Sequence, residues 1–150
     1  MMLERRQFVA AGLAGMAAAT LPNPLKADEH EHHASHDHDR SVFEKCAAAC
    51  SECQRECNSC ANHCAMMLKQ GHSKHATTLA TCQDCADMCV AAAQIVSRRG
   101  PFAELICKAC ADACAKCAEA CKKFPDDKHM AECAKVCLEC EKACREMLSA

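Results

Sequence analysis

Cysteines recur at intervals of three or four residues through most of this chain, and this spacing constrains its fold more than any other feature. The stretch CAAACSECQRECNSCANHC, residues 46–64, holds six of them. An alternation of three and four places successive side chains on one face of an α-helix. No segment alternates apolar and polar residues with a period of two, so strands are not expected. The pattern predicts helices whose thiols face a shared interior.

Capping and helix-ending signals divide the cysteine-bearing part into four helices. We expect them over about 41–69, 77–98, 101–124 and 127–148. Ser41 and Glu44 have the spacing of a capping box, and Gly71 follows the first helix. Pro101 stands where a first helical residue is expected, and Pro125 follows the third helix. Four helices with short connections favour an all-α fold, an antiparallel up-down-up-down four-helix bundle with a cysteine-lined core.

All eighteen cysteines fall on the inward seam of these four helices. They are, helix by helix, Cys46, Cys50, Cys53, Cys57, Cys60 and Cys64; Cys82, Cys85 and Cys89; Cys107, Cys110, Cys114, Cys117 and Cys121; and Cys133, Cys137, Cys140 and Cys144. The six on the first helix cover about 27 Å at about 1.5 Å per residue. The thiols therefore line most of the length of the bundle rather than one local site.

Packing and disulfide formation are two roles for these thiols. Free Cys packs as a small apolar residue, but Ala or Leu would fill a core without the risk of oxidation. Within a helix, Cβ atoms three or four residues apart are about 5 to 6 Å apart, whereas a disulfide needs roughly 3.5 to 4.5 Å. Disulfides between helices stay open, although disulfide scaffolds are typically rich in loops.

Metal binding agrees better with both the spacing and the number of thiols. Thiolates favour Cu(I), zinc and iron–sulfur clusters. Zinc held by four thiolates carries excess negative charge, which burial penalises heavily, whereas one Cu(I) per thiolate is neutral. An iron–sulfur cluster takes its thiolates from a wrapping loop more readily than from rigid helices. We therefore predict that the eighteen cysteines bind multiple Cu(I) ions per chain.

The seam extends past the cysteines to side chains that can pass or hold Cu(I). It reaches Met67 on the first helix, His75 before the second and Met130 on the fourth, and His63 borders it. In an antiparallel bundle these residues lie at one end, and soft thioethers and imidazoles bind copper. We take His63 and Met67 as candidate ligands, and His75 and Met130 as candidates for the mouth through which metal enters. A core Met or a solvated His is the alternative at each position.

The first 27 residues have the features of an export signal. Arg5 and Arg6 lie in a short charged segment, and an apolar stretch rich in Ala and Gly follows. This stretch is shorter than the roughly 20 apolar residues of a membrane span. The arginine pair resembles the twin-arginine signal, and a general signal with two chance arginines is the alternative. We predict that residues 1–27 are a twin-arginine-type signal, cleaved after Ala27 or alternatively Ala19, and that the mature chain is periplasmic or otherwise extracytoplasmic.

The mature chain shows no sign of binding nucleic acid or spanning a membrane. Without residues 1–27 it keeps 15 basic and 19 acidic residues, a net charge of −4 with His neutral, and no basic patch remains. Residues 28–40 hold five His among acidic and small residues and predict a His-rich disordered arm. Weak capture of divalent metal and a solvated linker are both open as its role.

The cysteine-lined helices at about 41–148, together with the exported, His-containing start, resemble the copper storage proteins, in particular their twin-arginine-exported branch. Few other families repeat C-x-x-x-C and C-x-x-C in phase on four helices. The resemblance implies that residues 41–150 form a four-helix bundle that stores many Cu(I) ions and assembles as a homo-tetramer. It also implies a recipient outside the cytoplasm, either a copper-dependent enzyme such as a methane-oxidising enzyme or a copper chaperone. The family places His and Met at an open end, which His63 and Met67 match best.

Two other functions stay open. A metallothionein-like zinc or cadmium buffer would use the same thiols with fewer ions per thiol. A thiol redox protein would need one reactive, exposed thiol beside a positive group, and the interior stripe distinguishes no such residue. No serine–histidine–acid set, phosphate loop or carboxylate pair is evident in the sequence, so we predict that the protein is not an enzyme.

Overall fold

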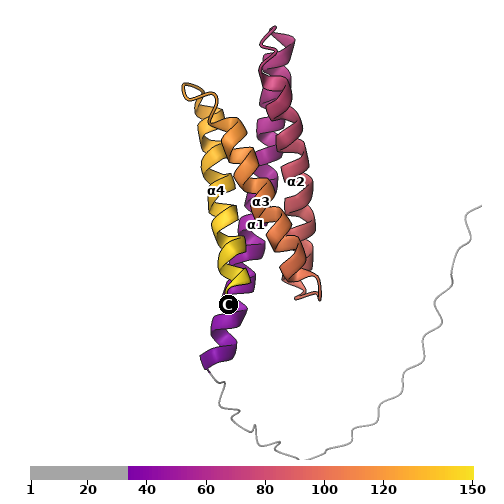
Figure 1. The fold of residues 1–150 in the computed structure, drawn as a ribbon, viewed down its shortest axis with the longest axis vertical. Helices are drawn as coiled ribbons and strands as arrows, with labels where there is room; N and C mark the ends of the chain where they lie inside the picture. Colours follow the sequence, from indigo (N-terminus) through magenta and orange to yellow (C-terminus); the bar gives the residue numbers. More distant parts are fainter. Residues whose placement is uncertain (1–33) are drawn as a thin grey trace, which may run out of the picture. The chain divides into compact units, whose positions relative to one another are not determined.

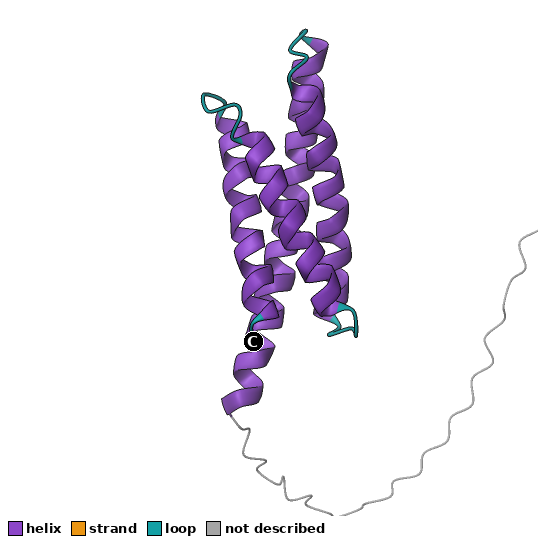
Figure 2. Ribbon diagram, in the orientation of Figure 1, coloured by secondary structure: helices purple, strands orange, loops and turns teal. Residues whose placement is uncertain are grey.

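The computed structural model describes residues 34–150, with side chains from residue 41 onward. Four helices make up this part: α1 (Ala34–Lys69), α2 (His75–Ser97), α3 (Ala103–Cys121) and α4 (Lys128–Leu148), in the order shown in Figure 1. Figure 2 shows helices joined by short loops, and no strand occurs within residues 34–150. The prediction of an all-α, cysteine-lined four-helix bundle is confirmed. The predicted export signal lies outside the described residues.

The helices occupy the corners of a square. α1 packs against α2 and α4, and α3 packs against the same two helices, so α1 and α3 lie diagonally opposite. Successive helices run antiparallel (Figure 1). The connections 70–74 and 122–127 therefore share one end, called here the mouth end, and the connection 98–102 lies with the C-terminus at the other, the closed end. Among the described residues, no helix combines the length and apolar character that crossing a bilayer requires.

Two predicted helix boundaries agree with the structure. Gly71 has a φ of 90°, in the left-handed region that glycine adopts without strain, and the chain turns there after α1. The N–H of His72 then bonds to the carbonyl of Met67 at 3.0 Å. Asp127 is the N-cap of α4, and its carboxylate accepts hydrogen bonds from the backbone N–H groups of His129 and Met130. These ends fix the lengths of the helices that carry the thiols.

Helix α1 starts earlier than expected. It begins at Ala34, so residues 34–40 of the segment expected to be a disordered arm are helical, and residues 28–33 lie outside the described part. Ser41 and Glu44 lie inside the helix and do not form the capping box that their spacing suggested. The physical reason is that no Gly or Pro stands between Ala34 and Ser41 to stop the helix from extending toward the N-terminus.

Helix α3 is shorter than expected at both ends. Pro101 is not its first residue, because the chain first turns, with the N–H of Ala103 bonded to the carbonyl of Gly100 at 3.0 Å. At the other end the helix stops at Cys121, and a turn joins the N–H of Phe124 to the carbonyl of Cys121. A residue that precedes proline avoids the helical conformation, which explains the early end before Pro125.

The core is built from thiols and small residues. Every cysteine is at most 1% exposed, and Ala side chains fill much of the remaining interior. At the closed end, Val96 and Met147 are buried and seal the column, while Phe43 is half-buried beside them. The guanidinium of Arg99 lies over the Phe43 ring, 5.3 Å from its centroid, which is a cation–π distance. This end is closed by apolar packing.

Asp127 provides the first test of the fold. Burial alone would raise its pKa, but hydrogen bonds from His63 and from the backbone N–H groups of Met130 and His129 hold that pKa below the usual 3.8. The Asp127→Ala substitution should lower the free energy of unfolding of the metal-free protein by about 1 to 2 kcal/mol, because α4 loses its cap. The Asp127→Asn variant should retain most of the wild-type free energy of unfolding, because Asn caps a helix as well as Asp does. Urea unfolding followed by circular dichroism measures both.

The same carboxylate gives a pH dependence. Its folded-state pKa is depressed, so its contribution is complete above pH 3.8 and is lost as the pH falls through the lower folded value. The difference in unfolding free energy between wild type and Asp127→Asn should shrink as the pH falls below 3.8 and through the folded-state pKa of Asp127. Equal stabilities of the Ala and Asn variants at neutral pH would contradict the capping role.

Candidate metal centre

The sulfur atoms of the core form a continuous column along the bundle. Helices α1 and α3, on opposite corners, meet through it: Cys46 and Cys107 have their sulfurs 3.6 Å apart, and Cys53 and Cys114 have theirs 3.8 Å apart. Helix α4 joins from the side, with 3.6 Å between the sulfurs of Cys57 and Cys137. No disulfide forms among the eighteen cysteines, all of which lie in the described part.

Within the column, sulfurs gather into groups of four whose atoms all lie within 4.8 Å of one another. Five such groups are Cys50, Cys110, Cys140 and Cys144; Cys53, Cys85, Cys89 and Cys114; Cys53, Cys57, Cys85 and Cys137; Cys57, Cys117, Cys133 and Cys137; and Cys60, Cys82, Cys121 and Cys133. Neighbouring groups share members. A sulfur that belongs to two groups can bridge two metal ions, so the sites are linked rather than separate.

The spacing of the sulfurs suits soft metal ions without a change of fold. Metal–thiolate bonds of about 2.3 Å place two sulfurs about 3.8 Å apart around a tetrahedral ion and about 4.6 Å apart on either side of a linear one. The observed contacts of 3.6 to 4.0 Å match the first value and need only small side-chain movements for the second. Distance alone therefore admits both zinc and Cu(I). Charge separates them, because a row of zinc ions with four thiolates each would bury excess negative charge.

Burial keeps the thiols protonated in the absence of metal. It raises the pKa of the Cys64 thiol, near the mouth end, from 9.0 to about 11. In the middle of the core, hydrogen bonds with neighbouring thiols and burial raise the pKa of Cys114 and Cys137. Burial opposes ionisation of these thiols at pH 7, and each protonated thiol that becomes a ligand releases its proton.

Helix α2 is the sulfur-poor wall of the column. Its seam begins with His75 and Thr78, both buried, before the three cysteines, and it ends with Ala92 and Val96. Thr78 was missed in the sequence reasoning, although its place between His75 and Cys82 keeps the three-and-four spacing that could have identified it. The other three helices consequently supply most of the sulfur.

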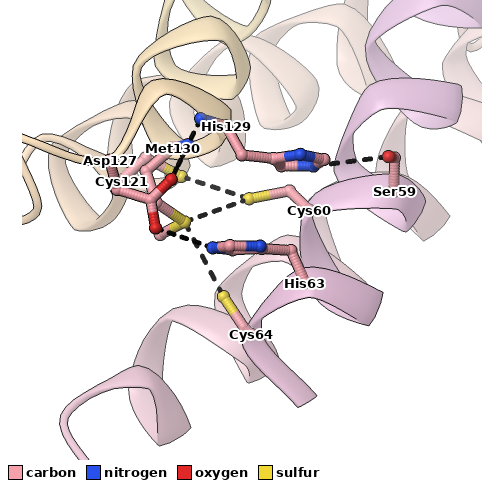
Figure 3. Close-up of polar contacts among 8 residues, drawn as sticks. All are labelled: Ser59, Cys60, His63, Cys64, Cys121, Asp127, His129 and Met130. Atoms are coloured by element: carbon pink, nitrogen blue, oxygen red, sulfur yellow. Dashed lines mark hydrogen bonds and ion pairs between the residues drawn. The ribbon is translucent and has the colours of Figure 1, made fainter. Parts of the chain in front are cut away.

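At the mouth end, Met130 extends the column, in agreement with its predicted place on the seam of the fourth helix; its role in metal entry stays a prediction. Its side chain is fully buried, and its sulfur lies 3.5 Å from the sulfur of Cys60 and 3.9 Å from that of Cys64. Figure 3 shows these contacts. The soft thioether continues the row of sulfurs toward the surface. Met67 is only half-buried and does not join the column; it lines an open hollow beside it.

His75 covers the column beside Met130. It is 4% exposed, its ring stacks on Phe124 with 4.0 Å between centroids, and its Nδ1 atom has no hydrogen-bond partner among residues 41–150. Burial, and then the neighbouring His63, lower the pKa of His75, so the ring is neutral at pH 7. A neutral imidazole with a free nitrogen is the form that binds metal. The contact with Phe124 was not foreseen.

His63 lies beside the column rather than in it. Its Nε2 atom is 2.7 Å from a carboxylate oxygen of Asp127, and its ring stacks on that of His129 with centroids 4.7 Å apart (Figure 3). Nε2 of His129 in turn lies 3.3 Å from the hydroxyl of Ser59. A metal-binding role for His63 would compete with this ion pair. The spacing of His63 along α1 gave no sign of the pair, because Asp127 is distant in sequence.

Comparisons with known proteins identify the family. The family model described as copper storage protein matches residues 39–149. No match was found among curated proteins.

Solved structures agree in fold and in sequence. A cytosolic copper storage protein from Streptomyces lividans with five coppers is 30% identical, with a TM-score of 0.65, over 76% of this chain and 98% of that one. The Cu(I)-bound copper storage protein BsCsp3, of Bacillus subtilis, is 34% identical, with a TM-score of 0.65, over 71% and 98%. The Streptomyces lividans protein loaded with ten copper equivalents is 31% identical, with a TM-score of 0.64, over 74% and 86%.

The buried thiols predict a loss of stability in alkaline solution. A thiol such as Cys64, with a pKa near 11 when folded and 9.0 when unfolded, contributes stability that is fully present below pH 9.0 and is lost as the pH rises toward 11. The unfolding free energy of the metal-free, reduced protein should therefore fall across this range, by an amount on the order of 2 kcal/mol per such thiol. Chemical unfolding under anaerobic conditions at a series of pH values measures it.

Cys64→Ala is the matched variant for this experiment. In this variant, the unfolding free energy should fall less steeply with pH in the alkaline range than in the wild type. Around neutral pH, its dependence on pH should be the same as in the wild type. A wild-type stability that stays flat from pH 9 to 11 would contradict protonated, buried thiols.

Proposed function

Because the chain belongs to the copper storage protein family, we propose that its thiol column stores many Cu(I) ions for supply to a copper-dependent protein outside the cytoplasm. The observation that carries this proposal is the sharing of cysteines between neighbouring four-sulfur groups. A carrier of one or two ions needs only a few ligands, whereas a row of linked sites holds many ions. Monovalent copper at about one ion per thiolate leaves the column neutral, as it is when the thiols are protonated.

Copper enters and leaves at the mouth end in this proposal. Met130 connects the column to the surface, and His75 presents an unpaired imidazole nitrogen beside it. Met67 lines the adjacent hollow and gives a further soft ligand. His63 exchanges its ion pair with Asp127 for copper as the metal passes. At the closed end, the described side chains include no imidazole, and Met147 and Val96 are buried in the apolar packing that seals the column.

The twin-arginine-type signal supports export of the folded chain, and residues 28–33 of the His-rich arm precede the bundle in the exported form. The bundle assembles as a homo-tetramer, as the resemblance implied. Analytical ultracentrifugation tests this, and a monomer at micromolar concentration would contradict it.

The recipient is a copper enzyme such as a methane-oxidising enzyme, or a copper chaperone that serves one.

An anaerobic titration of the reduced mature protein with Cu(I) tests storage. Thiolate-to-copper absorbance should rise until more than ~0.7 ions per cysteine are bound, because bridging thiolates serve two soft ions each. The metal-free protein should already be helical, and bound copper should raise its melting temperature, because the metal binds only the folded state. Saturation at one or two ions would sink the storage function.

Zinc is the matched control in the same titration. A zinc buffer would saturate near one ion per four thiols with tetrahedral thiolate sites. If zinc displaces bound Cu(I) at equal concentration, the metallothionein-like alternative replaces copper storage. Retention of Cu(I) in the presence of excess zinc is the expected result.

Deletion of the gene in the source organism tests export and supply together. After growth with copper and transfer to copper-free medium, the activity of the extracytoplasmic copper enzyme should decline faster in the deletion strain. The wild-type gene should restore it, whereas a gene with Arg5→Lys and Arg6→Lys should not, because the pathway receptor reads the arginine pair. Restoration by the lysine variant would show that twin-arginine export is not required.

A further inference from the structure

Five exposed lysines surround the mouth end, and we call them the lysine collar. They are Lys69, Lys74, Lys122, Lys123 and Lys128. Lys69 is the last residue of α1, Lys74 precedes α2, Lys122 and Lys123 follow α3, and Lys128 is the first residue of α4, so the collar includes the mouth-end terminus of every helix. A positively charged rim is unexpected at a site whose cargo is a cation.

The charge of the collar is not neutralised by neighbouring carboxylates. None of its lysines forms an ion pair with another residue in the range 41–150, whereas Lys108, Lys135 and Lys142 on the sides of the bundle each do. Of the two acidic residues at this end, Asp127 is already paired with His63 and caps α4. The five lysines thus stand against two carboxylates in the connections at this end, a net charge of +3 with His neutral.

Helix stability explains only part of the collar. Lys69, in the last turn of α1, and Lys122 and Lys123, directly after α3, stand where a positive charge favours the helix dipole. Lys74 is the N-cap of α2 without a side-chain hydrogen bond, and Lys128 is the first residue of α4. Neither helix has an acidic residue in its first turn, although a negative charge is favourable there and a positive one is not. Helix α3, which starts at the closed end, does carry the favourable charge, Glu104. Within the collar, Lys74 and Lys128 therefore oppose the helix dipoles of α2 and α4, the second beside the Asp127 cap.

The collar borders a hollow that leads to the candidate copper ligands. An open hollow of about 600 Å³ is lined by three lysines and two aspartates together with apolar and soft side chains: Lys74, Lys123, Lys128, Asp126, Asp127, Met67, His75, Phe124 and Pro125. Nδ1 of His75, in a side chain that is 96% buried, has no hydrogen-bond partner among the described residues. Positive charges and a vacant soft ligand thus line the same space, which is large enough for a small metal complex.

From these observations we propose that copper reaches the mouth as a small Cu(I) complex with a net negative charge, which the lysine collar attracts into the hollow. This inference rests on the proposed storage function and adds the chemical class of the carrier. A bare cuprous ion would be repelled by the collar, whereas an anionic complex would be concentrated there, and electrostatic steering of this kind changes association rates by about ten-fold or more. In the transfer, a bond from copper to a carrier donor breaks and a bond to His75 or a thiolate forms. The thiol proton leaves with the freed carrier ligand or the buffer, and copper stays monovalent.

Two matched copper donors test the proposal. Cu(I) bis-bicinchoninate is an anion, because its ligands carry carboxylates, and Cu(I) bis-biquinoline has the same coordination without them and is a cation. Initial loading rates of the reduced mature protein are followed by stopped-flow absorbance at low ionic strength, and the final copper content is measured for every sample. The charge-reversal variant is Lys74→Glu with Lys128→Glu, which favours the helix dipoles and so should still fold. The control is Lys116→Glu with Lys135→Glu, which changes the net charge equally on the side of the bundle.

The expected change in loading rate depends on two things: whether the substitutions are at the mouth end, and whether the copper donor is an anion or a cation. Loading from the anionic donor should be about ten-fold slower in the mouth variant, loading from the cationic donor should be faster, and the control should change neither by more than a small factor. Salt should suppress the difference, because the screening length is about 10 Å at 0.1 M ionic strength. Equal effects of mouth and control variants, or equal slowing for both donors, would overturn the inference while leaving the storage function intact.

Two further outcomes separate the possible failures. A final copper content of only one or two ions with either donor would overturn the storage function and this inference with it. Competition by polyglutamate, without competition by citrate at the same carboxylate concentration, would assign the collar to an acidic protein and overturn the small complex. Competition by citrate is the expected result.

Discussion

The whole structure depends on the fact that a buried thiol must stay neutral unless a cation compensates its charge. Without metal, burial raises the pKa of thiols such as Cys64, and eighteen S–H groups pack as small apolar side chains between alanines. With one monovalent ion per thiolate, the same interior is again neutral. The bundle can thus alternate between two fillings of nearly the same geometry, because the sulfurs are already 3.6 to 4.0 Å apart. A divalent ion with four thiolates of its own would leave two excess negative charges in the interior.

Much of the fold and the column was predictable from the sequence because both follow from local periodicity. The alternation of three and four assigned every cysteine to the interior, and Gly71 and Asp127 marked helix ends whose signals are local. The start of α1 was not predictable in the same way. A capping box at Ser41 is one option among several when no helix breaker precedes it, and the helix continued to Ala34.

The residues around the mouth show where such reasoning stops. The stacking of His75 on Phe124 and the pairing of His63 with Asp127 join residues from different helices, and their relative heights depend on how the helices slide along one another. Periodicity determines the face of a helix, but it does not determine this offset. Met130 was placed well because it continues the seam of its own helix, whereas His63 only borders its seam and turned toward the nearest carboxylate.

The four helices supply different side chains at the two ends of the column, so the two ends differ chemically. At the closed end, α2 supplies Ala92 and Val96 in place of cysteine. The last layer is therefore a triangle from the other three helices, in which the sulfur of Cys46 lies 3.6 Å from that of Cys107 and 3.7 Å from that of Cys144. At the mouth end, α2 supplies an imidazole and α4 a thioether, which are neutral ligands that bind copper without releasing a proton. A copper ion that moved inward from these ligands would exchange neutral donors for thiolates and would displace their protons, so the two ends of the column differ in the proton release that binding requires.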